Sequence, residues 1–160
     1  MKTMRWFCLV LAAAILWGGS AWADGACVQT ASANRSSGSV VITFVCTGDV
    51  ANGSIPATAF STANMALIKG THFLYSVIAY PTSGGTAPDA ADVTVSMKGL
   101  DLLGGKGANL IHATNPQEVT PYSLFTTMYK FFRIYDTLTL GVANQATASA
   151  EYTIDFVFER

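Results

Sequence analysis

Three cysteines are the most reactive side chains in this 160-residue chain, and their spacing limits what they can do. Cys8 lies in an apolar N-terminal run, whereas Cys27 and Cys46 lie beyond it. The last two lack the Cys-x-x-Cys spacing of a redox-active pair, and a zinc site would need two further ligands close by. In an exported chain such a pair is typical of a structural disulfide. Closing a loop of about 20 residues would stabilise the fold by roughly 3 kcal/mol.

The two histidines, His72 and His112, are the candidates for a general base or a metal ligand. Each opens or lies inside an apolar run, where a packed or rim histidine is more common. A nucleophilic serine would need a positioned base, and the chain has no Gly-x-Ser-x-Gly elbow. The sequence therefore predicts neither an enzyme nor a metal site.

The ten acidic residues are scattered singly, so paired carboxylates for acid catalysis are not indicated. Asp89, Asp92 and Asp101 form the densest group, but they do not match the spacing of a calcium loop. Residues 104–107 (Gly-Gly-Lys-Gly) resemble a phosphate loop superficially, although Gly107 stands where Ser or Thr is required. We expect these carboxylates to be solvated in loops, the glycines to serve backbone geometry, and no cofactor to be bound.

Binding is the other class of chemistry, and one aromatic segment is its candidate. The segment interleaves rings with Lys130 and Arg133, so at least one of its edges must face water or a partner. Packing in the core is the alternative interpretation, and a sugar-stacking platform is another. An exposed apolar patch marks protein–protein contact more often than a ligand site. The predicted interaction surface consists of Tyr122, Phe125, Tyr129, Phe131, Phe132, Arg133 and Tyr135.

The N-terminus predicts export. Lys2 and Arg5 precede an apolar run at residues 6–17, and Ala21-Trp22-Ala23 fits signal peptidase, so residues 1–23 read as a cleaved signal peptide. A membrane anchor is the alternative, but the run is shorter than the roughly 20 residues that span a bilayer. A lipoprotein modified at Cys27 is another, although the position of Asp24 does not suit a lipobox. We expect a periplasmic, cell-surface or extracellular protein without a transmembrane anchor after cleavage.

Cleavage after Ala23 would leave residues 24–160, with seven basic and ten acidic residues and no tryptophan. The resulting net charge of −3 gives no electrostatic reason to expect a nucleic acid partner. With no repeat, Pro-rich linker or charge block, these residues are expected to form one domain.

The candidate residues must be positioned by strands. The chain contains short runs rich in Val, Ile, Thr, Phe and Tyr, separated by turn residues, which is the pattern of strands. The nearly continuous run at residues 39–47 predicts a central strand covered on both faces, and residues 72–80 predict another strand. Asn52-Gly53 predicts a tight turn. Residues 57–70 suit either a short helix or a strand.

The last third of the chain has the clearest period. Val93, Val95 and Met97 alternate with polar residues, which predicts a half-exposed strand. Residues 138–142 and 152–158 also alternate, with a turn between them, and predict a C-terminal hairpin. Short strands at this spacing predict an all-β fold: a single antiparallel β-sandwich or jelly roll.

A series of turn and strand motifs occurs at residues 47–49, 52–56, 64–70, 74–77, 85–88, 92–95, 101–109 and 138–140 and in the closing strand. The order of these motifs resembles a group of small, uncharacterised β-rich proteins encoded in tailed-phage and prophage genomes. The resemblance implies a virion-associated or accessory β domain with no known catalytic residues. The signal peptide and the Cys27/Cys46 pair depart from it, since virion proteins assemble in a reducing cytoplasm; an exported relative would be displayed on the host surface.

Taken together, the residues predict an exported, non-enzymatic structural or surface-assembly domain that acts through protein–protein contacts or self-assembly. Edge strands and the aromatic segment are the expected contact surfaces. A secreted module that binds a glycan or a cell-wall ligand is the alternative.

Overall fold

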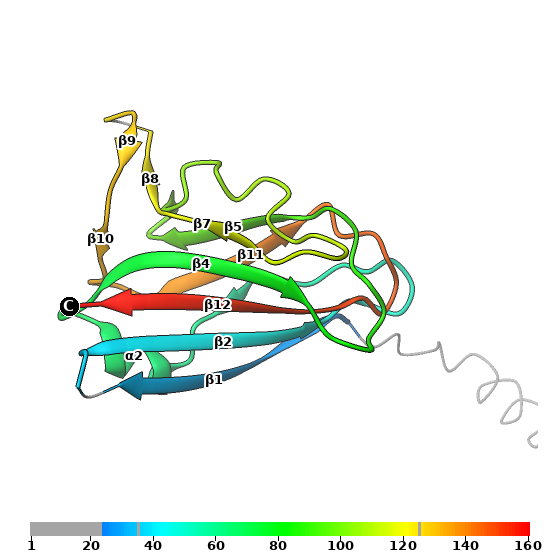
Figure 1. Ribbon diagram of the computed structural model, residues 1–160, viewed down its shortest axis with the longest axis horizontal. Coiled ribbons are helices and arrows are strands. Elements are labelled where there is room, and N and C mark those ends of the chain that lie inside the picture. Colours follow the sequence, from blue (N-terminus) through cyan, green and yellow to red (C-terminus); the bar gives the residue numbers. More distant parts are fainter. Residues whose placement is uncertain (1–23, 35, 125) are drawn as a thin grey trace, which may run out of the picture.

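The computed structural model describes residues 24–34, 36–124 and 126–160. Antiparallel strands and one short helix make up this part of the chain, so the expectation of an all-β fold is confirmed (Figure 1). No helix within these ranges is long and apolar enough to cross a membrane. The predicted signal peptide, residues 1–23, and Phe125 lie outside the described residues.

The larger sheet has the strand order β1-β2-β12-β4-β10, and β7 also pairs with β4. Every pairing in it is antiparallel. Its strands are β1 (Ala26–Asn34), β2 (Ser39–Thr47), β12 (Glu151–Glu159), β4 (Phe73–Pro81), β10 (Phe132–Arg133) and β7 (Gln117–Val119).

A second sheet has the order β3-β11-β5-β6, and a third consists of two short strands, β8 and β9. The β8–β9 pair projects from the body of the molecule next to β10, and we call it the arm (Figure 1). These strands are β3 (Thr58–Ala59), β11 (Leu138–Ala143), β5 (Asp92–Met97), β6 (Leu100–Asp101), β8 (Tyr122–Ser123) and β9 (Met128–Tyr129).

One cluster of buried side chains joins the two larger sheets. Along β12 the predicted alternation is confirmed, because Tyr152, Ile154, Phe156 and Phe158 are all fully buried. Val93, Val95 and Met97 of β5 are buried as expected, while Thr94 is exposed. The period of two along a strand therefore decides which side chains enter the core.

Two expectations about strands are wrong. In β2, Val40, Ile42, Phe44 and Cys46 are buried, but Val45 is 45% exposed, so the strand is not covered on both faces. The reason is that β-branched residues also suit the open face of a sheet. The predicted C-terminal hairpin does not form either, because β11 pairs with β3 and β5 while β12 pairs with β2 and β4. The turn between β11 and β12 crosses from one sheet to the other.

The ambiguous segment at 57–70 contains both candidate structures: the short strand β3 and then the helix α2 (Thr62–Ile68). The Ser61 side chain caps the helix by accepting a hydrogen bond from the Asn64 N–H at 3.2 Å. Gly70 follows with φ +81°, a conformation that suits glycine and ends the helix. A helix of seven residues is too short for the period of its apolar residues to distinguish it from a strand in the sequence.

Candidate functional site

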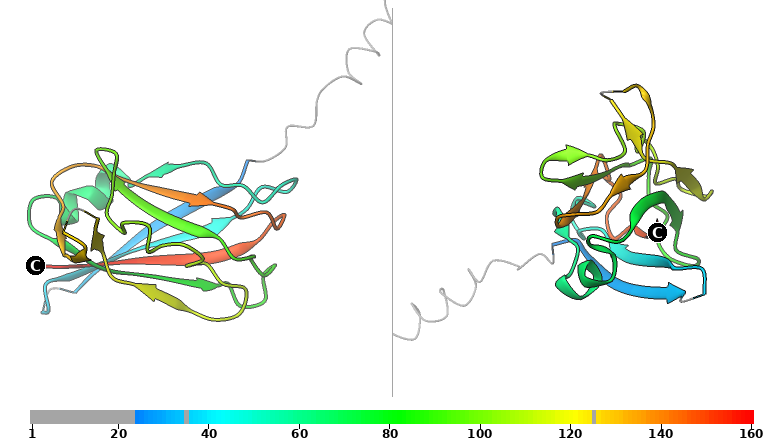
Figure 2. Two further views of the ribbon diagram at one scale, coloured as in Figure 1. Left: turned by 90° about the horizontal axis from the view of Figure 1, so that it is seen from above. Right: turned by 90° about the vertical axis from the view of Figure 1, so that its left-hand side faces the viewer.

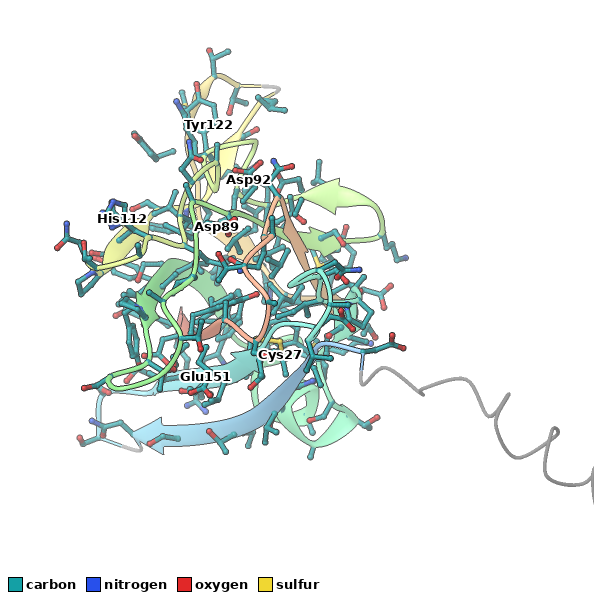
Figure 3. All side chains as sticks on the ribbon, turned by 90° about the vertical axis from the view of Figure 1, so that its right-hand side faces the viewer. Cys27, Asp89, Asp92, His112, Tyr122 and Glu151 are labelled. Carbon is teal, nitrogen blue, oxygen red and sulfur yellow. A yellow bond between two sulfur atoms is a disulfide. The ribbon has the colours of Figure 1, made fainter. Side chains whose placement is uncertain are left out.

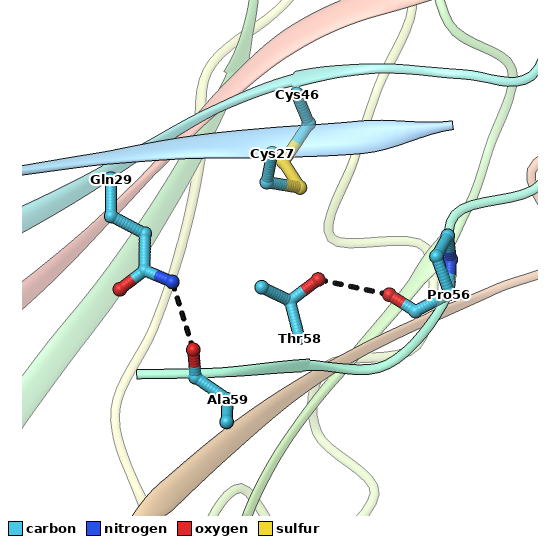
Figure 4. The surroundings of a disulfide bond; sticks show 6 residues. All are labelled: Cys27, Gln29, Cys46, Pro56, Thr58 and Ala59. Carbon is cyan, nitrogen blue, oxygen red and sulfur yellow. Dashed lines mark hydrogen bonds between the residues drawn. A yellow bond between two sulfur atoms is a disulfide. The ribbon is translucent and has the colours of Figure 1, made fainter. Parts of the chain in front are cut away.

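The predicted disulfide between Cys27 and Cys46 is present, and it joins directly opposed residues of β1 and β2. Cys46 is fully buried. Next to it, the Gln29 side chain donates to the Ala59 carbonyl at 2.8 Å (Figure 4). The same side chain accepts from the Ser61 N–H at 2.8 Å. β1 is thereby attached both to its own sheet and to the segment that leads into α2, which gives the cysteine pair a structural role.

The two histidines lie in separate structural settings. His72 is buried, and its ring bonds the Thr71 hydroxyl at 2.8 Å and the Gly38 carbonyl at 3.0 Å. His112 Nδ1 accepts from the backbone N–H groups of Thr114 and Asn115. Both rings therefore hold neighbouring chain in place, as the sequence suggested for packed or rim histidines.

Asp89 and Asp92, which are close together in the sequence, both hold the connection between β11 and β12. The Asn144 side-chain amide donates to Asp92 at 2.7 Å, and the Ala146 N–H donates to Asp89. Asp92 also accepts from the Asn109 N–H at 2.8 Å. Figure 3 shows the end of the molecule on which Asp89 and Asp92 are labelled. Over the described ranges, no group of three or more His, Cys, Asp or Glu could hold a metal ion.

The Gly-Gly-Lys-Gly segment closes on its own acidic residue. Asp101 accepts from the Leu103 N–H at 2.9 Å and from the Gly105 N–H at 2.8 Å. Two backbone donors that a phosphate would need are thus bonded to a carboxylate of the same loop. This hydrogen bonding supports the interpretation that the glycines allow the tight backbone turn of the loop and do not bind a phosphate.

The aromatic segment, in contrast, faces outward. Tyr129, Tyr135 and Phe131 are 66%, 56% and 51% exposed. Arg133 is exposed, while Tyr122 and Phe132 are half-buried. The segment is anchored by Ile134, which is fully buried and whose N–H donates to the His72 carbonyl at 2.9 Å.

The sequence did not predict two candidate residues of this surface, Phe73 and Tyr75, which lie at the start of β4. Both are exposed, and the Tyr75 ring stacks on the Phe131 ring with centroids 5.2 Å apart and planes 20° apart. β4 reads as a continuous apolar run, which hides their orientation. A register shift of the β4–β12 pairing next to Val157 aligns Leu74 with Phe158 and leaves Tyr75 unopposed.

The rings surround a hollow at one end of the molecule, which we call the aromatic hollow. It has a volume of about 490 Å³. Figure 2 shows the arm, β10 and the C-terminus at this same end. The hollow is lined by Phe73, Tyr75, Phe131, Glu159 and Arg160.

Cationic side chains lie over several rings of the same end. The ammonium groups of Lys106, Lys130 and Lys98 lie 4.9, 5.7 and 5.8 Å from the ring centroids of Tyr122, Phe132 and Tyr135. Such contacts contribute about 0.5–1 kcal/mol each at exposed sites. The backbone N–H of Thr137 and the Lys98 ammonium together hold the pKa of Asp136 below its usual range. Aromatic surface and positive charge therefore occur together here.

Comparison with known proteins found no matching family model, no similar curated protein and no similar solved structure.

Proposed function

We propose that this protein is an exported, non-enzymatic structural or surface-assembly domain that acts through protein–protein contacts at its aromatic end. We define the aromatic end as the arm, β10 and the aromatic hollow. The observation that carries the proposal is the outward position of Phe73, Tyr75, Tyr129, Phe131 and Tyr135. These rings come from two segments about fifty residues apart in the chain, and the fold places both segments at one end of the molecule.

The chemistry of the aromatic end supports this assignment. Phe, Tyr, Met and Arg are enriched in protein interfaces, and all four residue types are exposed here, with Met128 on the arm. An aromatic side chain buries 150–250 Å² when fully covered, so rings that are half exposed leave much of this stabilisation for a partner. A domain with no use for these rings would gain solubility from polar residues instead.

The bonding of the other candidate residues supports a role without catalysis. His112 and the three carboxylates discussed above accept hydrogen bonds from nearby backbone N–H groups, and His72 donates to the Gly38 carbonyl, so each has a local structural task. An active site would instead bring such groups together around a shared point.

Several finer assignments belong to the same proposal. The two larger sheets share one core, which is typical of a β-sandwich or a jelly roll. The cysteine pair fits an oxidising compartment and therefore export through the predicted signal peptide at residues 1–23. A relationship to phage- or prophage-encoded surface proteins would be compatible with these features.

Site-specific photo-cross-linking in the producing cell tests the contact. A photoreactive phenylalanine analogue at Phe131 should form a covalent adduct with a protein, identified by mass spectrometry. The same analogue at Val50, which is 49% exposed on the opposite end, should form none. Equal adducts at both positions, or none at Phe131, would contradict the proposal.

Binding of a glycan is the second candidate, and the aromatic hollow is the observation that favours it. Stacked rings in a hollow that Glu159 and Arg160 also line combine a platform for a sugar face with residues that can form hydrogen bonds. A glycan array probed with residues 24–160 decides between the candidates. If the wild type binds a glycan and Tyr75→Ser/Phe131→Ser does not, glycan binding becomes the function in place of protein contact. If the wild type binds no glycan on the array, the glycan candidate is excluded.

A further inference from the structure

The larger sheet has one protected edge and one open edge. β4 lies at the protected edge, where β10 covers its first residues and β7 covers its middle. β1 forms the open edge: within the described residues only β2 pairs with it. Figures 1 and 2 both show β1 at the rim of the sheet with no strand on its outer side. The edges of the second sheet are β3 and β6, which are only two residues long.

β1 lacks the features by which proteins usually guard such an edge. Its nine residues, ACVQTASAN, contain no charged residue and no proline. Its pairing with β2 is continuous from Ala26 to Asn34 without a bulge. Long, flat and uncharged edges of this kind readily pair with another strand.

The register of the disulfide shows which main-chain groups are free. Directly opposed residues of antiparallel strands alternate between hydrogen-bonded pairs near 5.5 Å and non-hydrogen-bonded pairs near 4.5 Å between Cα atoms. The Cys27 and Cys46 Cα atoms are 4.0 Å apart, so theirs is a non-hydrogen-bonded pair. The N–H and C=O groups of Cys27, Gln29, Ala31 and Ala33 therefore point away from β2, toward open solvent.

We propose that β1 pairs in antiparallel fashion with β1 of a second copy of this chain, so that two larger sheets become one continuous sheet. The strand is uncharged throughout, so two copies approach without like-charge repulsion. The register that overlaps the whole strand places Thr30 opposite its own counterpart and Val28 opposite Ser32. In this register the outward-pointing residues of one copy pair with those of the other, Cys27 with Ala33 and Gln29 with Ala31, each twice by symmetry. These four pairs would form about eight main-chain hydrogen bonds, two for each pair.

The disulfide decides between strand addition and strand exchange. Because Cys27 is bonded to Cys46, β1 cannot leave its own sheet to complete another one. Addition at the edge preserves every pairing of β1 with β2. This dimer does not depend on the contact at the aromatic end, and its two-fold axis would direct the two aromatic ends to opposite extremes.

Sedimentation equilibrium of the oxidised chain, residues 24–160, tests the dimer. The wild type should be dimeric, and Thr30→Lys should raise the dissociation constant by about fivefold, because it places two like charges opposite each other. Val45→Lys is the matched control, since it adds the same charge to the same face on β2. Mixing Thr30→Lys with Thr30→Glu should restore a heterodimer, and this restoration also checks the register.

A second variant probes the main chain. Ala31→Pro removes an N–H that points outward, so it should abolish the dimer while leaving the melting temperature almost unchanged. Ser32→Pro removes an N–H that bonds β2 and should destabilise the fold instead. A wild type that is monomeric at every concentration would overturn the inference. A dimer lost in Tyr75→Ser/Phe131→Ser but retained in Thr30→Lys would also overturn it, while leaving the proposed contact at the aromatic end intact.

Discussion

The two ends of the molecule use their side chains in opposite ways. At the end that holds the β2–β3 and β11–β12 connections, which we call the loop end, the Asp49 carboxylate is buried and accepts from the Ala51 N–H at 2.7 Å and the Asn52 N–H at 3.0 Å. Its backbone also accepts from Gly53 and Ser149. At the aromatic end, rings such as Tyr129 and Phe131 lie in solvent.

This difference separates stability from recognition. Polar groups of the loop end such as the Asp49 carboxylate are bonded within the protein, so their removal should lower the free energy of unfolding. Apolar groups of the aromatic end are only partly packed, so a change there should alter association and leave folding nearly intact.

The largest effect is expected from Gly53→Ala at the loop end. Gly53 has φ +72°, and a Cβ there would clash with the Thr147 carbonyl oxygen. The strained backbone and the clash together should lower the free energy of unfolding by about 3 kcal/mol or more. Gly84→Ala is the control, because its φ is +81° but no atom lies within 4 Å of the added Cβ. Urea denaturation should show a loss of only about 1 kcal/mol for the control; equal losses would mean that the clash is relieved.

Removal of the disulfide should have the next largest effect. In Cys27→Ala/Cys46→Ala the unfolded chain regains the freedom of a loop that spans 19 positions, which corresponds to roughly 3 kcal/mol. Thermal unfolding should therefore show a lower melting temperature, and reduction of the wild type should reproduce the shift. A variant as stable as the oxidised protein would show that hydrogen bonds of Gln29 and β2 suffice to hold β1.

The aromatic end should respond weakly to the same measurement. Tyr75→Ser/Phe131→Ser removes a stacked pair whose members are both exposed, so the free energy of unfolding should fall by no more than about 1 kcal/mol. The photo-cross-linked adduct from a probe at Tyr129 should disappear in the same variant. A loss of stability as large as that of Gly53→Ala would show that the rings belong to the core.

The smallest effect concerns Tyr80 and Tyr152, which lie on the neighbouring strands β4 and β12 near the loop end. Burial, the charge of Asp155 and a hydrogen bond to it raise the pKa of Tyr80, whereas the pKa of Tyr152 is raised by burial and by Asp89. A raised folded pKa contributes stability below pH 10 that is lost as the pH rises through the folded value. In a spectroscopic titration, Asp155→Asn should lower the pKa of Tyr80 and leave that of Tyr152 in place. If both pKa values shifted together, the effect of Asp155 would not be confined to the outer face of the sheet, because Tyr152 is buried in the core.

Part of this fold can be predicted from the sequence, because side-chain alternation and turn residues are local features of the chain. The alternation in β12 correctly assigned Tyr152, Ile154 and Phe156 to the core, and Asn52-Gly53 marked a turn that the structure contains. The same patterns suggested that β11 and β12 pair with each other, which is wrong. Alternation shows which face of a strand is apolar but carries no information about which other strand lies beside it.

The candidate site shows the same limit. Its C-terminal half, from Tyr122 to Tyr135, was predicted from a cluster of rings beside basic residues. Its other half, Phe73 and Tyr75, was not, because an exposed ring and a buried ring look alike inside an apolar run. The irregular pairing of β4 with β12 is a property of two strands, and it leaves Tyr75 free to stack on Phe131.

By itself, the sequence determined the all-β character, the cysteine pair and the inward residues of the regular strands, since side-chain period and residue type act over a few positions. Only the tertiary structure decided which strands became neighbours, which edge stayed open at β1 and which rings met at one end. These outcomes depend on how all strands bury their apolar faces together, and that free energy is shared among contacts far apart in the chain.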